Sequence, residues 1–109
     1  MGNFLIFVKT SCLRVISKKV LREFWQKHPE CEQQLKSWYG EAESAIWKSP
    51  SDIKKDYPSA SVITGNRIVF NIKGNKYRLI VKINYHYNNV WIRFVGTHSQ
   101  YDKIDAEKI

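Results

Sequence analysis

The chain has 109 residues, the size of a single domain, and this length leaves no room for a separate cofactor domain. Hydrophobic residues make up 43% and charged residues 26% of the chain, as in ordinary folded proteins, so global disorder is excluded. The formal net charge is +8 and the pI is about 9.6, and a domain this basic favours a polyanionic partner such as a nucleic acid.

The cysteines and the longest apolar run limit the cellular compartment. Cys12 and Cys31 are too few for a disulfide framework, and they lack the spacing of a zinc site. The apolar run from Phe4 to Val8 is far shorter than the roughly 18 residues that span a membrane, and no secretory signal surrounds it. We therefore expect a cytoplasmic protein that does not associate with membranes.

Residues 1–13 differ in composition from the rest of the chain and show no clear periodicity. We interpret them as an N-terminal extension, which is either an added edge strand or the result of a start codon assigned upstream of the true one. Residues 14–109 are expected to form one domain.

The next part of the chain predicts one strand and two helices. Arg14 to Ile16 is a short strand candidate, and Ser17 after it is a favourable N-cap residue. Apolar residues spaced by three and four positions predict helices over residues 18–28 and 30–45. Residues 49–59 contain two clusters of helix breakers, around at most one helical turn.

From Arg67 onward the hydrophobic period changes to two, which predicts strands. Two strands, over residues 67–73 and 76–85, are joined by a primed hairpin turn at Gly74-Asn75, and a third covers residues 90–95. Residues 99–109 form a short helix or a loose tail. The expected fold is α+β, with an N-terminal strand and two helices packed on a C-terminal three-stranded antiparallel meander.

Acidic residues are absent from the predicted sheet. The 45 residues between Asp56 and Asp102 contain no Asp or Glu but six Lys and Arg, so the sheet has an uncompensated positive face. Metal-dependent phosphodiester cleavage needs clustered carboxylates, which this stretch lacks. RNA carries its own nucleophile, the 2′-hydroxyl, and side-chain cations and proton-transfer groups suffice to cleave it. We expect no metal and no small-molecule cofactor.

Four residues of this region are candidates for such chemistry. Arg78 in the middle strand and Arg93 in the last strand carry guanidinium groups that bind phosphate in a fork and stay charged. His98 and Tyr101 follow the last strand closely enough for a tight turn to bring them to the rim of the sheet. Histidine transfers protons near neutral pH.

Ordinary structural roles remain open for the other aromatic and histidine residues. Tyr85, Tyr87 and Trp91 can stack on bases, although aromatic residues in strands more often belong to the core. His86 lies near a turn and His28 lies on the apolar face of a predicted helix, where both have structural explanations. Spacing alone thus leaves a generic basic α+β domain beside an RNA-directed one.

Three blocks of the sequence resemble the HigB family of type II toxins. They are Arg14–Trp25, Arg67–Leu79 (RIVFNIKGNKYRL) and Ile92–Asp105 (IRFVGTHSQYDKID). The second and third blocks are specific, and the similarity covers residues 14–109, which is the chain without its N-terminal extension.

The resemblance implies a RelE-like fold and the activity of an mRNA interferase, an endoribonuclease that cuts translated messenger RNA, typically on the ribosome. It also implies inhibition by a cognate antitoxin encoded beside the toxin. The family's strand arginines correspond to Arg78 and Arg93, and its C-terminal motif to His98, Tyr101 and Asp102. The residues that match the basic strand segment or lie on the same positive face are the expected RNA contacts: Arg67, Asn71, Lys73, Lys76 and Lys82.

Two other functions compete with this hypothesis. A non-catalytic RNA-binding module would use the same face and would bind RNA without producing cuts. A DNA-binding helix-turn-helix would use the two predicted helices, but the second helix carries four glutamates that repel phosphate: Glu30, Glu32, Glu41 and Glu43. We rank the DNA-binding alternative last.

Overall fold

The computed structural model describes residues 14–109, and the predicted N-terminal extension lies outside the described residues. The elements in chain order are β1 (Arg14–Ile16), α2 (Lys18–Lys27), the 3-10 helix η1 (Pro29–Cys31), α3 (Glu32–Ser44), α4 (Pro50–Asp56), β2 (Ser61–Ile63), β3 (Arg67–Ile72), β4 (Tyr77–Asn84), β5 (Asn89–Thr97) and α5 (His98–Tyr101). None of the helices in this range combines the length and the apolar composition that crossing a membrane requires.

The strands form one sheet in the order β1-β5-β4-β3-β2. Strand β1 is parallel to β5, and the other neighbours are antiparallel. The predicted α+β class is confirmed, but the predicted strand count is wrong, because β2 adds a fifth strand at the edge beside β3. A strand of three residues is too short to show a period of two, and it is placed by its pairing, for example of Val62 with Ile68.

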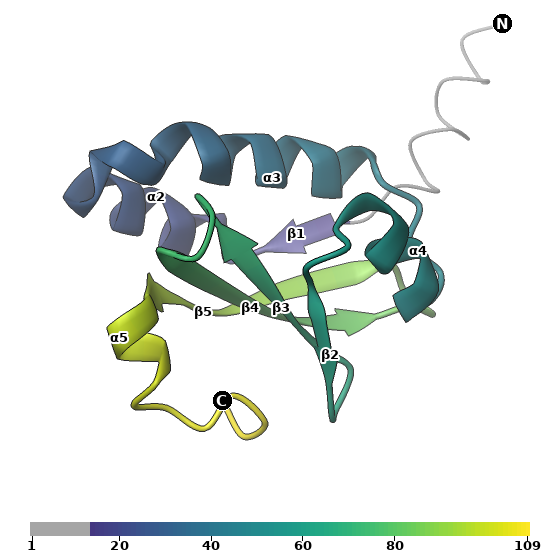
Figure 1. Ribbon diagram of the computed structural model, residues 1–109. Coiled ribbons are helices and arrows are strands. Elements are labelled where there is room, and N and C mark those ends of the chain that lie inside the picture. Colours follow the sequence, from purple (N-terminus) through teal and green to yellow (C-terminus); the bar gives the residue numbers. More distant parts are fainter. Residues whose placement is uncertain (1–13) are drawn as a thin grey trace, which may run out of the picture.

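The helices α2 and α3 lie on one face of the sheet, and α5 with the C-terminal segment lies on the other (Figure 1). The alternation predicted for β3 and β4 is confirmed, because every second residue is buried against the helices. Each large apolar side chain buried in this way stabilises the fold by about 1.5–3 kcal/mol. The main contributors are Leu21, Trp25, Leu35, Trp38, Ile68, Phe70, Leu79 and Val81.

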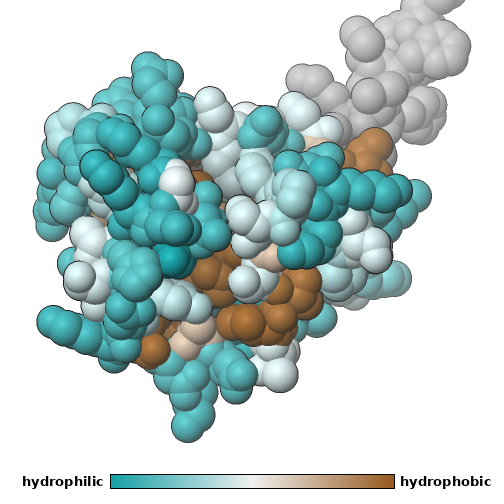
Figure 2. Space-filling view, viewed as in Figure 1, coloured by the Kyte–Doolittle hydropathy of each residue, from teal (hydrophilic) through white to brown (hydrophobic). Residues whose placement is uncertain are grey.

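The outer side of the molecule is largely polar in the same view. Figure 2 shows hydrophilic surface over much of the helical layer, and the most extensive apolar area lies near the middle of the view. The two helices therefore bury their apolar stripes in the core and leave their charged residues in solvent, as the sequence pattern predicts.

Two local features in the first half of the chain differ from the predictions. Ser17 is the N-cap residue of α2, as predicted, but its side chain makes no capping hydrogen bond, because its φ of 75° is left-handed and a side chain that caps a helix needs extended backbone. Helix α4 has seven residues, more than the single turn expected. Pro50 occupies its first turn, where a missing N–H costs nothing, and the buried Ile53 attaches the helix to the core.

The hairpin turn between β3 and β4 is shifted by one residue from its predicted position. The two consecutive residues with left-handed backbone are Lys73, with φ 53°, and Gly74, with φ 67°, rather than Gly74 and Asn75. A left-handed conformation costs a residue such as Lys73 about 1–2 kcal/mol. The Lys73 ammonium donates to the main-chain oxygen of Glu30 at 3.0 Å, and this bond attaches the turn to η1.

A second bond joins the sheet to η1 close to this turn. Tyr77, buried at the start of β4, donates its hydroxyl hydrogen bond to the carboxylate of Glu30. This bond raises the pKa of Tyr77 to about 12 and lowers the pKa of Glu30 below its usual value. The hairpin that carries Arg78 is thereby held against the helical layer.

Candidate active site

The sheet face opposite α2 and α3, which we call the open face, carries most of the predicted cations. Strand register aligns Arg67, Lys82 and Trp91 in one cross-strand row, and cross-strand partners project from the same face. In the middle of this face, Val69 and Ile80 are paired and buried, although they are not part of the helix-side core. The polar groups of the open face are therefore divided between its two ends.

The C-terminal segment after α5 lies along the open face. It leaves α5 and returns to the start of β3, where the Arg67 Nε donates to the main-chain oxygen of Ile109 at 2.8 Å (Figure 1). The segment that was predicted as a short helix or a loose tail is thus one helical turn followed by a strap across the sheet.

At the end of the open face beside α5, three of the four candidate catalytic residues come together. The guanidinium carbon of Arg78 lies 5.6 Å from the centre of the Tyr101 ring, in cation–π contact. His98 begins the same short helix as Tyr101, and its Nδ1 lies 3.0 Å from Oδ2 of Asp102. The main-chain nitrogen of His98 donates to the oxygen of Lys76 at 2.9 Å, so α5 is attached to the β3–β4 hairpin.

The residues around α5 explain why the chain turns here. The Thr97 Oγ1 accepts from the main-chain nitrogen of Gln100 at 3.2 Å, and Oε1 of Gln100 accepts from the nitrogen of Thr97 at 2.8 Å, which forms a capping box. A Cβ atom at Gly96 would lie 2.5 Å from Phe94 Cζ and 2.7 Å from Gln100 Oε1, so only glycine fits without displacement. The segment from Gly96 to Tyr101 therefore sets the position of His98.

This arrangement supplies the groups that phosphodiester chemistry needs. The Arg78 guanidinium stays charged at any working pH and offers several donors to a phosphate. The His98 side chain is 50% exposed, and because its Nδ1 faces Asp102, its Nε2 is left to contact a substrate. The Tyr101 ring packs against the Arg78 guanidinium and restricts its position.

Arg93 lies elsewhere on the open face. Register places Ile92 opposite Val81 and Phe94 opposite Ile80, so Arg93 occupies a bulge. The residue opposite Arg78 is Gly96, so strand pairing does not place Arg93 beside Arg78. The two arginines are separated by two to three positions along the strands, which is roughly 7–10 Å.

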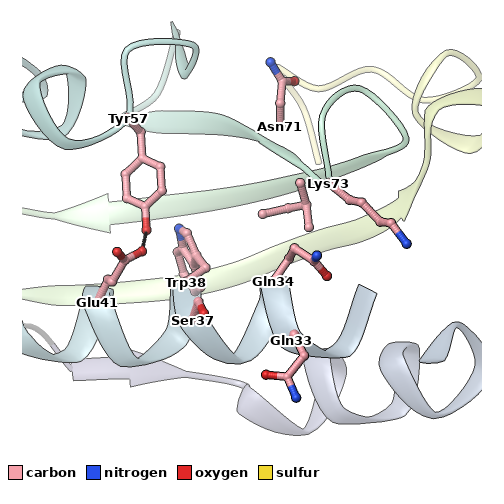
Figure 3. Close-up of a pocket in the computed structure, with 9 residues that line it drawn as sticks. Gln33, Gln34, Ser37, Trp38, Glu41, Tyr57, Asn71 and Lys73 are labelled. Carbon is pink, nitrogen blue, oxygen red and sulfur yellow. Dashed lines mark hydrogen bonds between the residues drawn. The ribbon is translucent and has the colours of Figure 1, made fainter. Parts of the chain in front are cut away.

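The predicted RNA contacts fall into three groups. Lys76 is exposed in the hairpin beside His98, and Lys82 lies at the opposite end of the open face in the row of Arg67. Asn71 and Lys73 line a different pocket of about 280 Å³, between α3 and the end of β3 (Figure 3).

The pocket between α3 and β3 is bordered by helix residues as well as by the two predicted contacts. Glu41 of α3 accepts a hydrogen bond from Tyr57 at one side of it (Figure 3). The Asn71 Nδ2 donates to the main-chain oxygen of Ser59 at 3.4 Å, and Lys73 is engaged by η1 as described above. Register nevertheless pairs Asn71 with Arg78 across β3 and β4, so Asn71 lies at the Arg78 end of the open face, and Lys73 follows it in the hairpin turn.

Asp102, which belongs to the family motif, and Trp91, which can stack on a base, were not assigned a role among the site residues predicted from the sequence. Asp102 follows His98 by four positions, the spacing at which helical side chains meet, and this spacing is the signal that identifies it. Trp91 has the same alternation phase as Arg93 in β5, and this phase distinguishes it from the core residues Val90 and Ile92.

Metal-ligating and thiol groups do not gather at this site in the part of the chain that the structure describes. Within residues 14–109, no three His, Cys, Asp or Glu side chains cluster closely enough to hold a metal ion. Cys31 is a free, buried thiol whose burial raises its pKa.

Comparison with known proteins covers most of this chain. The sequence model of the HigB toxin family, described as the RelE-like toxic component of a toxin-antitoxin system, matches residues 31–104. The mRNA interferase toxin HigB of Escherichia coli K12 is 26% identical over 96 residues, which cover 86% of this chain and 92% of that protein. The mRNA interferase HigB of Shigella flexneri has the same identity and coverage, and that of Escherichia coli O6:H1 is 23% identical over 94 residues, which cover 84% of this chain and 91% of that protein. The matched family range contains Arg78, Arg93, His98, Tyr101 and Asp102.

Proposed function

This chain belongs to the HigB family of RelE-like toxins, and from that premise we propose that it is an mRNA interferase, an endoribonuclease that cuts messenger RNA in the cytoplasm. The observation that carries the proposal is the cluster of Arg78, Tyr101 and the His98–Asp102 pair at one end of a basic sheet. In this proposal residues 14–109 are the whole toxin domain, in the RelE-like arrangement of an N-terminal strand and two helices on an antiparallel meander.

Cleavage proceeds through attack of the 2′-hydroxyl on the adjacent phosphorus, with departure of the 5′-oxygen. Arg78 binds the scissile phosphate and stabilises the charge that develops on it. Tyr101 holds the guanidinium in place through its ring. His98 moves protons between the 2′-hydroxyl and the leaving oxygen, and Asp102 orients its imidazole. Every step uses side chains, so the reaction needs no metal ion.

The remaining cations position the RNA around the cut. Lys76 lies next to His98, and Arg93 and Lys82 extend the positive surface along the open face. Arg67 adds the guanidinium nitrogens that its bond to Ile109 leaves free. Asn71, the cross-strand partner of Arg78, lies within reach of the same RNA, and Lys73 contacts the RNA only if the strand also passes over the β3–β4 turn.

Two macromolecular partners follow from this function. The substrate is messenger RNA that is being translated, held on the ribosome. A cognate antitoxin neutralises the toxin with an acidic segment, because the sheet between Asp56 and Asp102 contains no acidic residue of its own.

Primer extension on a message that is translated in vitro tests the activity, with ribosomes present or omitted. Wild type should produce discrete cuts, and Arg78→Ala should reduce the cleavage rate about 10²–10³-fold. Arg22→Ala, which removes an exposed arginine of α2 in the helical layer, is the matched control and should behave as wild type. Cleavage by Arg78→Ala at the wild-type rate would overturn the site assignment.

The chemistry of the new ends tests the absence of a metal. Attack by the 2′-hydroxyl leaves a 2′,3′-cyclic phosphate and a 5′-hydroxyl, whereas metal-assisted attack by water leaves a 5′-phosphate in most nucleases. A 5′-phosphate at the cut sites would contradict the mechanism. If wild type binds RNA but yields no cuts with or without ribosomes, the non-catalytic RNA-binding module is the correct function.

A further inference from the structure

A second pocket opens on the open face at the end remote from α5. It has a volume of about 520 Å³, and six of its lining residues carry the argument: Asn66, Lys82, Asn84, His86, Trp91 and Arg93. They come from the turn before β3, the end of β4, the following turn and the first half of β5. Lys82 and Trp91 are direct cross-strand partners, so both project from the open face into the same pocket.

The charge of this pocket favours an anion. Lys82 and Arg93 are exposed, and none of the ion pairs among residues 14–109 involves either of them. No acidic residue lines the pocket, and the imidazole of His86 lies in the lining beside the two cations. A cationic pocket without internal neutralisation is suited to a phosphate group.

The other side chains favour a nucleotide base over a simple anion. Trp91 is half-buried at the pocket wall, and an indole in this position is a platform on which any base can stack. Asn84 accepts from the Tyr87 nitrogen at 3.0 Å through its Oδ1, so its NH₂ group remains for a ligand. Amides of this kind recognise the edges of unpaired bases in RNA.

The distance from the catalytic end fits one continuous RNA strand. Lys82 lies four residues after Arg78 on β4, which is about 13 Å. Stacked nucleotides advance by about 3.4 Å each, so this distance corresponds to at most about four nucleotides. An RNA strand with its scissile phosphate on Arg78 therefore reaches Trp91 within a few nucleotides of the cut, passing over or beside the C-terminal segment that returns to Arg67.

We propose that this pocket binds one unpaired nucleotide of the RNA substrate, with the base stacked on Trp91 and the phosphate held by Lys82 and Arg93, and that it thereby determines where the cut falls. The inference rests on the proposed function and adds to it a specificity site that is distinct from the Arg78 and His98 cluster.

Binding of a short single-stranded RNA to the full chain tests the pocket independently of cleavage. The His98→Ala background keeps the RNA intact. In this background Trp91→Leu should weaken binding about 5- to 100-fold, and Trp91→Phe, which keeps an aromatic ring, should restore most of it. Tyr87→Leu is the matched control, because Tyr87 is an aromatic residue of the neighbouring turn that is 69% exposed and does not line the pocket.

Cut positions on a translated message provide the second readout. In the active background, Trp91→Leu should still cut RNA, but the nucleotide preference at a fixed distance from the cut should be lost, while Tyr87→Leu keeps the wild-type pattern. Trp91→Phe covers the case in which the leucine variant fails to fold, as judged by circular dichroism.

The outcomes separate the two proposals. Absence of cuts by wild type would overturn the proposed function, and the binding measurement would still decide whether the pocket takes a nucleotide. If wild type cleaves RNA but Trp91→Leu keeps the wild-type affinity and the wild-type cut positions, the assignment of the pocket as a nucleotide-binding site is wrong. An equal loss of affinity in Tyr87→Leu would also contradict that assignment.

Discussion

At the scale of single residues, the candidate site combines one short-range and one long-range relationship. His98 and Asp102 are four positions apart in the same helical turn, and their side chains meet at 3.0 Å. Arg78 lies in β4, whereas Tyr101 lies in α5, directly after β5. The two side chains meet only because β4 pairs with β5. In the proposed mechanism the local pair transfers protons, and the distant arginine binds the phosphate.

Removal of the imidazole or of its carboxylate partner should affect the reaction to different degrees. We expect His98→Ala to lower the single-turnover cleavage rate about 10²–10⁴-fold, because it removes the proton-transfer group. Asp102→Asn should cost about 10–100-fold, because the imidazole remains but loses its orienting partner. RNA affinity should change little in either variant.

Asp105→Asn is the matched control for the carboxylate. Asp105 lies in the C-terminal segment, where its carboxylate is 3.9 Å from Lys108 rather than beside His98. Asp105→Asn should retain the wild-type rate, and a wild-type rate in Asp102→Asn would rule out the orienting role.

At the scale of secondary-structure elements, α5 is a single turn whose position is set by its flanks. The capping box between Thr97 and Gln100 fixes its start, and the contact of His98 with Lys76 attaches it to the hairpin. Because Gly96 leaves no space for a Cβ atom, the end of β5 and the start of α5 form one rigid corner.

Two glycine substitutions should change stability in opposite directions. Gly96→Ala displaces Gln100 Oε1 and opens the capping box, and it should cost about 1 kcal/mol of unfolding free energy and lower the cleavage rate. Gly40→Ala, at an exposed position of α3 with no atom within 4 Å of the added Cβ, should stabilise the protein by about 1 kcal/mol. Urea unfolding measures both changes. If Gly96→Ala stabilised the protein, the claim that Gly96 leaves no space for a Cβ atom would be wrong.

The bond between Tyr77 and Glu30 makes stability depend on pH at the junction of β4 and η1. Folding raises the pKa of Tyr77 from 10 to about 12, so its contribution is complete below pH 10 and is lost as the pH rises toward 12. Folding lowers the pKa of Glu30, so its contribution is present above the usual value of 4.5 and is lost at more acidic pH.

Tyr77→Phe should therefore be less stable than wild type near neutral pH, and the difference should shrink at both alkaline and acid pH. Urea midpoints across the pH range measure this difference. The exposed Tyr87→Phe should track wild type throughout. A gap between wild type and Tyr77→Phe that stays constant from pH 7 to about 12 would show that the bond does not form.

At the scale of the whole molecule, the helical layer and the sheet differ in charge. The helical layer carries both acidic and basic side chains. In the 45 residues from Tyr57 to Tyr101, by contrast, there are six Lys and Arg and no Asp or Glu. The strands place several of these cations on one face, at both ends of an apolar middle. The two ends are about 13 Å apart along β4, so a single polyanionic strand that passes over the C-terminal segment is long enough to contact both.

RNA binding should weaken steeply with salt, because each contact between a cation and a phosphate releases counterions. Lys82→Gln should reduce the slope of log affinity against log salt by about one. Lys19→Gln, on α2 and paired with Glu23 at 4.0 Å, should leave the slope unchanged. Equal slopes in all three proteins would show that Lys82 does not contact RNA.

Elements with a clear period were predictable, and so was the three-residue strand β1, whereas the short elements β2 and α4 were not. The alternation in β3 and β4 identified the buried face, because an antiparallel strand with one covered face shows a period of two. Strand β2 and helix α4 have three and seven residues, too few to establish a period, so pairing and the buried Ile53 place them. The relationship of Arg78 to Arg93 was not predictable, because it depends on one bulge.

The amino-acid sequence by itself determined the α+β class, the acid-free basic sheet and membership in the HigB family, which the family match over residues 31–104 confirms. These properties depend on composition, on local periodicity and on contiguous blocks. Only the tertiary structure decided that Tyr101 meets Arg78, that His98 is attached to the β3–β4 hairpin, that Arg93 lies with Lys82 and Trp91, and that the C-terminal segment returns to Arg67. The physical reason is that strand register and chain return are set by packing between residues distant in sequence, where a shift of one position moves a side chain to another site.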